Sequence, residues 1–334
     1  MQQAGTQITL GLGRYTLRQR LASSAYGEVW RADGPHSARA VAVKLINEEH
    51  MARVRPDQGQ RWVASATQEI AFLRALAPWD LRHIVRLIDH GQHQGLPVMA
   101  LELLDADLAG HVAAERRAGR PIGLARSLRW IAQLNQALAK VHQCGWRYLD
   151  LKPSNVLLDQ GLGRVKLADF GTNRPLRDAG AHAYAGTPNW QAPEQFFGLA
   201  DDACHTSALT DYFALGVLFY YLVCDGALLR YCEQCGAAYR NYASGAAIVL
   251  RKRYHGSLPT TLHPDEEQRF ADCVERHGTS ADTALALLRM LLASAPGERP
   301  AHALDISRAI DAIGAPFTIA HWPGAANQAG GRAA

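Results

Sequence analysis

Carboxylate, amide and ammonium groups lie close together in two short stretches near the middle of the chain. The run GWRYLDLKPSNVLL (145–158) carries Asp150, Lys152 and Asn155, and Asp169 follows the strand-like run RVKLA. Asn155 and Asp169 offer hard oxygen ligands, the kind that Mg²⁺ prefers. A plainer explanation of the first run is a turn held by Asx hydrogen bonds. The residue types therefore indicate either a magnesium site or such a turn.

A further lysine ends an apolar, strand-like run. Lys44 closes the segment AVAVK, and an ammonium in that place can extend over a cleft and neutralise phosphate oxygens. By itself, such a lysine more often snorkels from the edge of a strand. Glu69 lies in a predicted helix, where a lone glutamate is usually solvated. What either residue does depends on the elements that position it.

Short β-rich runs dominate the first hundred residues. Between 15 and 43, alternating runs are separated by Gly, Ser and Pro, which favours an antiparallel meander. Residues 62–77 carry apolar side chains at three- and four-residue spacing, which is typical of an amphipathic helix. Two more strands fit near 84–90 and 96–103. This part of the chain is predicted to be a small sheet with one helix.

Helical patterns dominate the rest of the chain. Residues 125–145 form a long periodic helix that ends at a glycine, and the almost wholly apolar 208–223 suits a helix buried inside a lobe. A third helix is predicted at 279–294, after a Thr/Ser cap. The polar residues 1–13 are predicted to be a flexible leader, and the Gly- and Ala-rich residues 313–334 a flexible tail.

In chain order, the motifs resemble those of the eukaryotic-type (Hanks-type) protein kinases, in the form found in bacterial serine/threonine kinases, over roughly residues 15–312. The matching motifs are AVAVK, YLDLKPSN, Asp169-Phe170-Gly171, GTPNWQAPE (186–194), Asp211 in TDYFALGV and Arg299 in PGERP. The resemblance implies an α+β, two-lobed protein-kinase-like fold. A small N-terminal antiparallel β lobe with one helix would span about 14–101, followed by a hinge at 102–105. The larger, mainly α lobe would span about 106–312, with an insertion at about 225–278.

The resemblance also implies a reaction, the transfer of the γ-phosphoryl group of Mg-ATP to Ser/Thr hydroxyls of protein substrates. Asp150 would accept the proton of the attacking hydroxyl. Lys152 would steady the transferring phosphoryl group, and Thr187 would help to seat the substrate. Lys44, paired with Glu69, would neutralise the α- and β-phosphates.

Cofactor contacts are implied for further residues. Asn155 and Asp169 would ligate Mg²⁺, and the backbone of Glu102, Leu103 and Leu104 would face the adenine. The other implied nucleotide contacts are Ala22, Ser24, Gly27, Val29, Ala42 and Leu101.

Two implied contacts would support the site from behind. Glu194 is expected to form a buried ion pair with Arg299. Asp211 is expected to hold the backbone of the catalytic loop, although its position also suits a helix N-cap.

The sequence departs from the family in two places. The phosphate loop of the family reads G-x-G-x-x-G-x-V, whereas the run from Ala22 reads ASSAYGEV, so Gly27 is the one glycine that remains. We expect weaker nucleotide binding, because glycines let backbone amides approach phosphates closely. Leu149 replaces the arginine of H-R-D. The loop therefore has no positive charge at this position that a phosphorylated activation loop would neutralise. We therefore hypothesise activity that does not depend on phosphorylation of Thr172 or Tyr184.

Two other functions are compatible with parts of this pattern. A kinase-fold pseudokinase that acts as a binding or scaffold module would explain the altered glycine loop and Leu149, but has no physical need for the intact Lys, Asp and Asn set. A small-molecule kinase of the aminoglycoside or choline type shares the Asp, Asn and Asp core but gives no reason for GTPNWQAPE.

Composition is that of an ordinary globular protein. The chain has 334 residues, 48% hydrophobic and 20% charged, with a net charge of +4 spread along its length, which gives no sign of a nucleic-acid binder. It contains no apolar run of about 18 residues and no signal-like start, so we expect no membrane association and a cytoplasmic location. Six cysteines in a chain of this length do not suggest a disulfide framework.

The insertion carries one motif that the kinase resemblance does not explain. Cys232 and Cys235 form a C-x-x-C pair that looks like one knuckle of a zinc ribbon. A structural zinc site needs four ligands and no second pair is present, so two ordinary buried thiols are the alternative. Recruitment is expected to act in trans or through the 225–278 insertion, which is the expected place for a partner protein.

Overall fold

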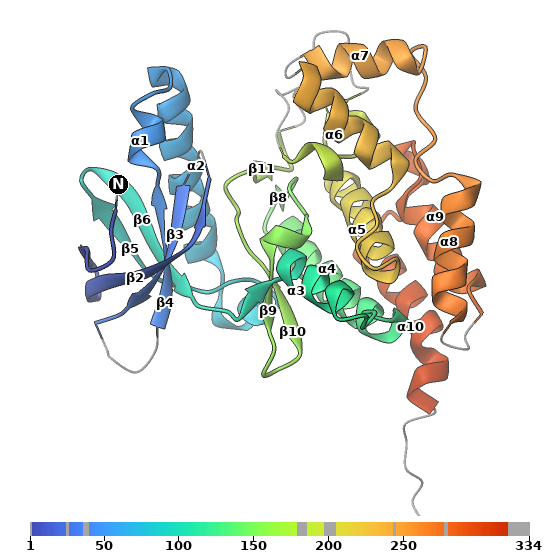
Figure 1. The fold of residues 1–334 in the computed structure, drawn as a ribbon, viewed down its shortest axis with the longest axis horizontal. Helices are drawn as coiled ribbons and strands as arrows, with labels where there is room; N and C mark the ends of the chain where they lie inside the picture. Colours follow the sequence, from blue (N-terminus) through green and yellow to red (C-terminus); the bar gives the residue numbers. More distant parts are fainter. Residues whose placement is uncertain are drawn as a thin grey trace, which may run out of the picture.

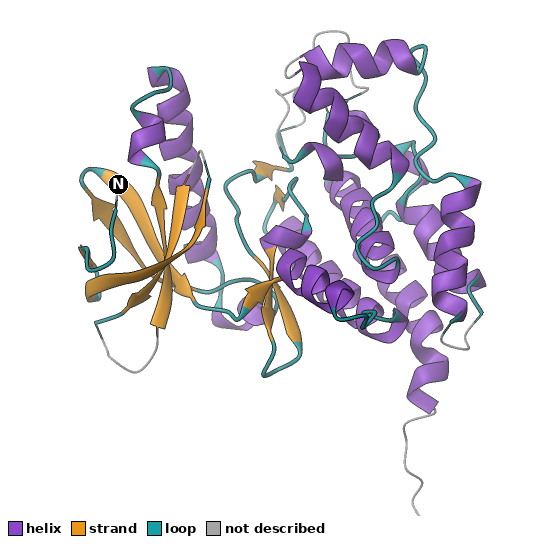
Figure 2. Ribbon diagram, viewed as in Figure 1, coloured by secondary structure: helices purple, strands orange, loops and turns teal. Residues whose placement is uncertain are grey.

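The computed structural model of the chain describes residues 2–24, 27–35, 40–178, 186–196, 205–242, 245–276 and 280–319. Two lobes lie side by side (Figure 1), with the N-terminal, blue part of the chain in one and the green to red part in the other. Figure 2 shows that the first lobe is mostly strand and the second mostly helix. This is the two-lobed α+β architecture expected from the sequence.

A six-stranded antiparallel sheet forms the N-terminal lobe, in the order β1-β2-β3-β4-β6-β5. Its strands are β1 (Gln7–Leu10), β2 (Gly13–Ser23), β3 (Gly27–Asp33), β4 (Ala40–Ile46), β5 (Leu87–His93) and β6 (Leu96–Glu102). Because side chains alternate between the two faces of a strand, residues such as Tyr15, Leu17 and Val43 gather in one buried cluster. The predicted meander and both predicted later strands are present.

The first strand corrects the prediction of a flexible leader over residues 1–13. Residues Gln7–Leu10 pair with β2, and Ile8 is fully buried. The run alternates polar and apolar residues, with Gln7 and Thr9 outward and Ile8 and Leu10 inward, which is the period-two pattern of an edge strand. Four residues are too few for that alternation to stand out among glycines.

One long helix packs against this sheet. Helix α2 (Pro56–Ala75) contacts β4, β5 and β6, and it follows the single-turn helix α1 (Glu48–Met51). It begins six residues before the predicted start, because Pro56 suits the first turn of a helix. Its buried side chains include Glu69, a charged group whose partner is described below.

Helices make up most of the second lobe. They are α3 (Leu108–Arg117), α4 (Leu124–Gln143), α5 (Ala208–Val223), α6 (Arg230–Tyr242), α7 (Ala246–Arg253), α8 (Pro264–Glu275), α9 (Asp282–Leu291) and α10 (Ala303–Ile319). Helix α5 is buried on nearly all sides, as its apolar sequence predicts, and α4 and α9 pack against it. Among the described residues, no helix combines the length and the apolar character that crossing a membrane requires.

Small antiparallel sheets face the first lobe. One contains β10 (Arg164–Leu167), β9 (Val156–Asp159) and β7 (Ala106–Asp107), and the other pairs β11 (Arg174–Pro175) with β8 (Trp146–Arg147). The chain segments that leave these strands carry the two stretches singled out from the sequence.

The prediction of a flexible tail is wrong for residues 313–319. Helix α10 continues to Ile319, and Ile313 is buried against the core of the helical lobe. The Gly and Ala content of the segment suggested a loose end, but Ile306, Ile310 and Ile313 recur on one helical face and are buried together. Residues 320–334 lie outside the described residues.

A bidentate ion pair joins the end of the GTPNWQAPE segment to the last part of the lobe. Arg299 Nη1 and Nη2 donate to Glu194 Oε1 and Oε2 at 2.7 and 2.8 Å, and the side chain of Arg299 is fully buried. The same guanidinium donates to the carbonyls of Leu209, Ala293 and Ser294. The pair expected from the sequence is confirmed, with the added finding that three backbone carbonyls share the cation.

Replacing Arg299 with methionine should lower the free energy of unfolding by about 3–5 kcal/mol, because it leaves a poorly solvated carboxylate and several carbonyls without a donor. Urea unfolding followed by tryptophan fluorescence measures this loss. The matched control is Arg308→Met, which removes an exposed arginine from a pair with Asp305 and should change stability by less than about 1 kcal/mol. Equal losses in the two variants would contradict the role of the buried pair.

Candidate functional site

An ammonium group between two carboxylates connects the lobes. Lys44, on β4, donates to Glu69 Oε2 at 2.7 Å and to Asp169 Oδ1 at 2.8 Å. Glu69 also accepts from the N–H of Phe170 at 3.2 Å. The strand, helix α2 and the segment after β10 therefore meet at one cation, as the sequence predicted for the first two.

Each charge in this triad depends on the others. Burial lowers the pKa of Lys44, but Asp169 and Glu69 outweigh burial and raise it, so the ammonium stays protonated. The Lys44 charge lowers the pKa of Asp169. Burial raises the pKa of Glu69 against the opposing effect of Lys44. The cation thus keeps a carboxylate available in a half-exposed position at Asp169.

A second cluster forms in the loop after β8. Asp150 Oδ1 accepts from the Thr187 hydroxyl at 2.7 Å, and its Oδ2 accepts from Lys152 Nζ at 2.7 Å and from Asn155 Nδ2 at 3.0 Å. Lys152 Nζ also donates to Thr187 Oγ1 at 2.6 Å. Four residues from two separate motifs therefore form one hydrogen-bonded cluster around Asp150. The plainer explanation of an isolated Asx turn does not account for the contacts of Lys152 and Thr187.

Opposing effects act on the carboxylate at the centre of this cluster. Burial raises the pKa of Asp150, while the Lys152 ammonium and the Thr187 hydroxyl lower it. Asp169 contributes a smaller rise through charge repulsion. Without Lys152, its positive charge would no longer oppose the effects that raise the pKa of Asp150.

The backbone of the loop is held by a buried carboxylate from α5. Asp211 Oδ2 and Oδ1 accept from the N–H groups of Tyr148 and Leu149 at 2.8 and 2.7 Å, and His142 Nε2 contacts Oδ2 at 2.8 Å. Leu149 has a φ of 69°, a left-handed conformation that a leucine adopts only when its surroundings hold it there. The expected role of Asp211 is therefore confirmed.

Tyr148 stands where the loop triplet of the family usually has a histidine, and its ring packs against other aromatic side chains. The ring of Tyr148 packs edge-on against Phe170, which in turn contacts Phe72 of α2, and the Tyr148 hydroxyl donates to the carbonyl of Ala168. Thr172 donates to the carbonyl of Tyr148 at 3.1 Å. Tyr184, the other position of the phosphorylation hypothesis, lies outside the described residues.

Helix α2 makes two contacts that sequence reasoning missed. Ser65 Oγ donates to the carbonyl of Gly171 at 2.6 Å, and Gln68 Nε2 donates to the carbonyl of Asn173. Ser65 lies one turn before Glu69 on the same helical face. That spacing was the available signal, but a serine in a helix is too common to indicate a partner.

The glycine-poor hairpin between β2 and β3 is fixed by side-chain hydrogen bonds. Ser24 and Gly27 exchange main-chain and hydroxyl contacts at 2.9 to 3.3 Å, and Asn47 Nδ2 donates to the carbonyl of Ser24 at 3.0 Å. A Cβ atom at Gly27 would lie 2.8 Å from the Leu45 carbonyl, which explains why this glycine remains. Ala22 pairs with Val29 at the base of the hairpin.

The predicted hinge connects the lobes through a side chain as well as through the backbone. Leu101 is buried and pairs with Ala42 on β4. The Glu102 carboxylate accepts from Lys166 of β10 and from the N–H of Arg86. Leu104 follows two residues after β6. The Glu102–Lys166 ion pair therefore fixes the direction of the backbone at the start of the segment predicted to face the adenine.

The sequence predicts one site for Mg²⁺ and raises a second for zinc. Asn155 bonds to Asp150 and Asp169 bonds to Lys44, and their amide and carboxylate oxygens are donors of the kind that Mg²⁺ prefers. The zinc knuckle is not formed, because Cys232 and Cys235 lie buried within helix α6. Burial raises the pKa of both thiols, that of Cys235 to about 12, whereas zinc binds thiolates. In the described segments, no three His, Cys, Asp or Glu side chains gather as a metal site.

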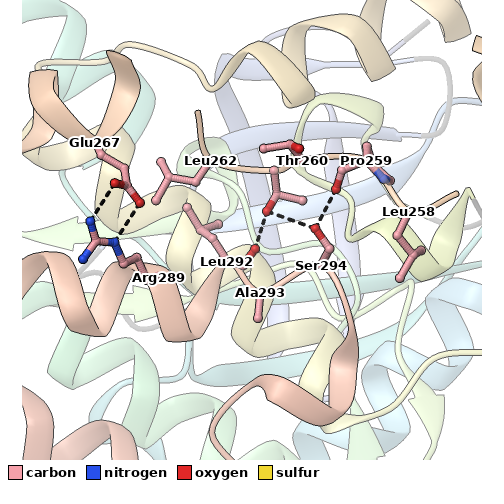
Figure 3. A pocket seen from close by; sticks show the side chains of 10 residues that line it. Leu258, Pro259, Thr260, Leu262, Glu267, Arg289, Leu292, Ala293 and Ser294 are labelled. Carbon is pink, nitrogen blue, oxygen red and sulfur yellow. Dashed lines mark hydrogen bonds and ion pairs between the residues drawn. The ribbon is translucent and has the colours of Figure 1, made fainter. Parts of the chain in front are cut away.

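A pocket of about 340 Å³ lies elsewhere, between the loop before α8 and the end of α9 (Figure 3). The Glu267–Arg289 ion pair borders it on one side, and Ser294 donates to the Pro259 carbonyl on the other. None of the residues that line it belongs to the Lys44 or Asp150 clusters. The charged groups suited to chemistry are at the junction of the lobes, so we assign the functional site there.

Comparison with known proteins identifies the family of the chain. The family model described as the protein kinase domain matches residues 15–310. The serine/threonine-protein kinase PknA of Mycobacterium tuberculosis (strain ATCC 25618 / H37Rv) is 28% identical over 278 residues, which are 80% of this chain and 57% of PknA. The carbon catabolite-derepressing protein kinase of Candida tropicalis is 29% identical over 214 residues, 64% of this chain and 32% of that protein. The chain thus spans little more than half the length of PknA.

A solved structure shows the same fold. The PknI kinase domain of Mycobacterium tuberculosis superposes with a TM-score of 0.59 at 22% identity, covering 93% of this chain and 99% of that chain. At this identity the likeness carries the fold alone.

Proposed function

Since the chain belongs to the protein kinase domain family, we propose that it transfers the γ-phosphoryl group of ATP to serine or threonine hydroxyls of protein substrates. The observation that carries the proposal is the convergence of Lys44, Asp150 and Asp169 at the junction of the lobes, each with the partners that phosphoryl transfer requires. A pseudokinase that only binds partners has no need for a buried, oriented Asp150 beside Lys152 and Thr187.

The contacts support the following roles. Lys44 would hold the α- and β-phosphates, with Ala22, Ser24, Gly27 and Val29 of the hairpin beside them. Asp150 orients the attacking hydroxyl and accepts its proton, and Lys152 stabilises the charge on the transferring group. Asn155 and Asp169 would hold Mg²⁺, which neutralises phosphate charge when bound. Ala42, Leu101 and the backbone of the Glu102 to Leu104 segment would hold the adenine.

Transfer of label from [γ-³³P]ATP to an acidic and to a basic generic protein tests the proposal. Asp150→Asn keeps the size of the side chain and should reduce kcat by about 10²–10⁴-fold, because the proton acceptor is lost. Asp57→Asn, at an exposed position on α2, is the matched control and should retain wild-type activity. Transfer that persists in Asp150→Asn would refute the role of Asp150, and a wild type that binds ATP without transfer would support the pseudokinase.

The pH dependence of kcat/KM gives an independent prediction. Asp150 acts as a base in its deprotonated form, and burial raises its pKa, so activity should fall with decreasing pH at values above those of an ordinary aspartate. Lys152→Met removes a charge that lowers this pKa and should shift the acidic limb to higher pH. Lys152→Arg keeps the charge and should leave the limb near its wild-type position. A limb that stays in place in Lys152→Met would contradict the assignment.

The insertion supplies a surface for protein substrates. Helix α6 packs on the 3₁₀ turn Pro188–Trp190, beside Thr187, and a Cβ atom at Gly236 would overlap the side chain of Asn189. Arg251 Nε donates to the carbonyl of Phe196 at 3.3 Å. Helices α6 and α7 are thus fixed to the segment that contains Thr187.

Charge on these helices favours an acidic partner. Arg240, Lys252 and Arg253 are exposed, against one exposed acidic residue, Glu233, on the described parts of α6 and α7. Exposed Tyr242 and Ile248 add apolar area beside the charges. We propose that an acidic segment of the protein substrate binds this surface while its hydroxyl occupies the site.

Replacing Arg240, Lys252 and Arg253 with glutamine should lower kcat/KM for the acidic protein by about tenfold at low salt, through a loss of electrostatic attraction. Activity toward a short neutral peptide should not change. Glutamine at Arg53, Arg55 and Arg61 removes the same charge from the other lobe and serves as the control. Equal effects of the two triple variants would attribute the loss to net charge and contradict a local docking surface.

A further inference from the structure

Two buried thiols lie in contact at the base of the insertion. Cys224 caps the C-terminus of α5 and Cys273 lies on α8, two helices that pack against each other. The two side chains hydrogen-bond to each other, and both are buried. Neither residue takes part in the proposed phosphoryl transfer.

A guanidinium group makes the two thiols unequal. Arg276 Nη2 donates to Cys273 Sγ at 2.9 Å, so Cys273 accepts from Arg276 while it contacts Cys224. The hydrogen bond from Cys224 and the charge of Arg276 lower the pKa of Cys273 to about 7, although burial, Asp225 and Asp272 oppose the shift. The hydrogen bond with Cys273 and burial raise the pKa of Cys224. Cys273 therefore ionises more readily than Cys224, which favours it as the sulfur that reacts first.

We propose that Cys273 and Cys224 form an oxidisable pair that hydrogen peroxide converts to a disulfide between α8 and α5. The Cys273 thiolate attacks one peroxide oxygen, the O–O bond breaks and hydroxide leaves, which gives a sulfenic acid. The sulfur of Cys224 then attacks the sulfenic sulfur, and an S–S bond forms as water leaves. In sum, two thiols are oxidised by two electrons and one peroxide is reduced to two waters.

The position of this pair gives the disulfide a structural consequence. The chain between the two cysteines contains α6 and α7, and α6 packs on the turn beside Thr187. The disulfide would close this segment into a covalent loop at its base. Loop closure restricts the unfolded chain, so the oxidised protein should have a Tm about 5 °C higher than the reduced one. The modification does not depend on the proposed kinase activity.

Peptide mapping by mass spectrometry after brief treatment of the full chain with hydrogen peroxide tests the proposal. We expect a peptide pair crosslinked through Cys224 and Cys273 that dithiothreitol releases, together with the rise in Tm. In Cys224→Ser, dimedone should trap the sulfenic acid at Cys273, because no thiol is left to resolve it. The exposed Cys144 and the buried Cys232 and Cys235 are internal references and should react more slowly than Cys273.

Arg276→Gln tests whether the charge of Arg276 activates Cys273 or whether the closeness of the two thiols is enough for the reaction. It should slow the reaction of Cys273 at pH 7 about threefold through a smaller thiolate fraction, and rescue should appear at pH 9. Arg61→Gln, an exposed arginine on α2, should leave the rate unchanged. Wild-type protein that forms no Cys224–Cys273 crosslink, or in which Cys273 reacts no faster than Cys144, would overturn the proposal.

Discussion

The ion pairs of Lys44 with Glu69 and Asp169 are the interaction on which the geometry of the site depends. Glu69 is almost fully buried, and a buried carboxylate is costly unless a cation compensates it. Because Glu69 needs a cation beside it, its ion pair with Lys44 fixes the distance between β4 and α2. The second contact, to Asp169, fixes the N-terminal lobe against the segment after β10. A single cation therefore connects β4 and α2 to the segment that carries Asp169.

Behind the site, buried polar groups set the backbone of the catalytic loop independently of its side chains. Asp211 holds the N–H groups of Tyr148 and Leu149, and this contact stabilises the left-handed conformation at Leu149. Because the carboxylate binds main-chain atoms, a leucine can replace the family's arginine without loss of the loop geometry. Tyr148 keeps the aromatic contact with Phe170 and adds a hydroxyl that reaches the Ala168 carbonyl. The departures from the family pattern thus change the charge at the loop and leave its shape.

Most of the fold and the central residues could be predicted because their signals are local and periodic. The apolar run of α5, the alternation of β2 to β4 and the Asp150 to Asn155 spacing each have a direct structural counterpart. The failures have physical causes. Strand β1 is stabilised by pairing with β2, which four residues do not reveal. The C-x-x-C motif left a zinc knuckle and two ordinary thiols as alternatives, and the structure has the thiols, buried in helix α6. The contacts of Ser65 and Gln68 depend on tertiary position alone.

The glycine-poor hairpin illustrates how a lost sequence feature can be compensated. Glycines in a phosphate loop give backbone amides freedom to approach an anion, and that freedom carries an entropic cost when the loop orders on binding. Here Ser24 bonds to Gly27, and Asn47 holds the Ser24 carbonyl, so hydrogen bonds within the protein hold the two ends of the loop. The one remaining glycine is kept where β3 passes too close to Leu45 for a side chain. Side-chain contacts at the two described ends of the hairpin thus replace part of what the glycines would supply, and the two missing glycines do not by themselves argue against nucleotide binding.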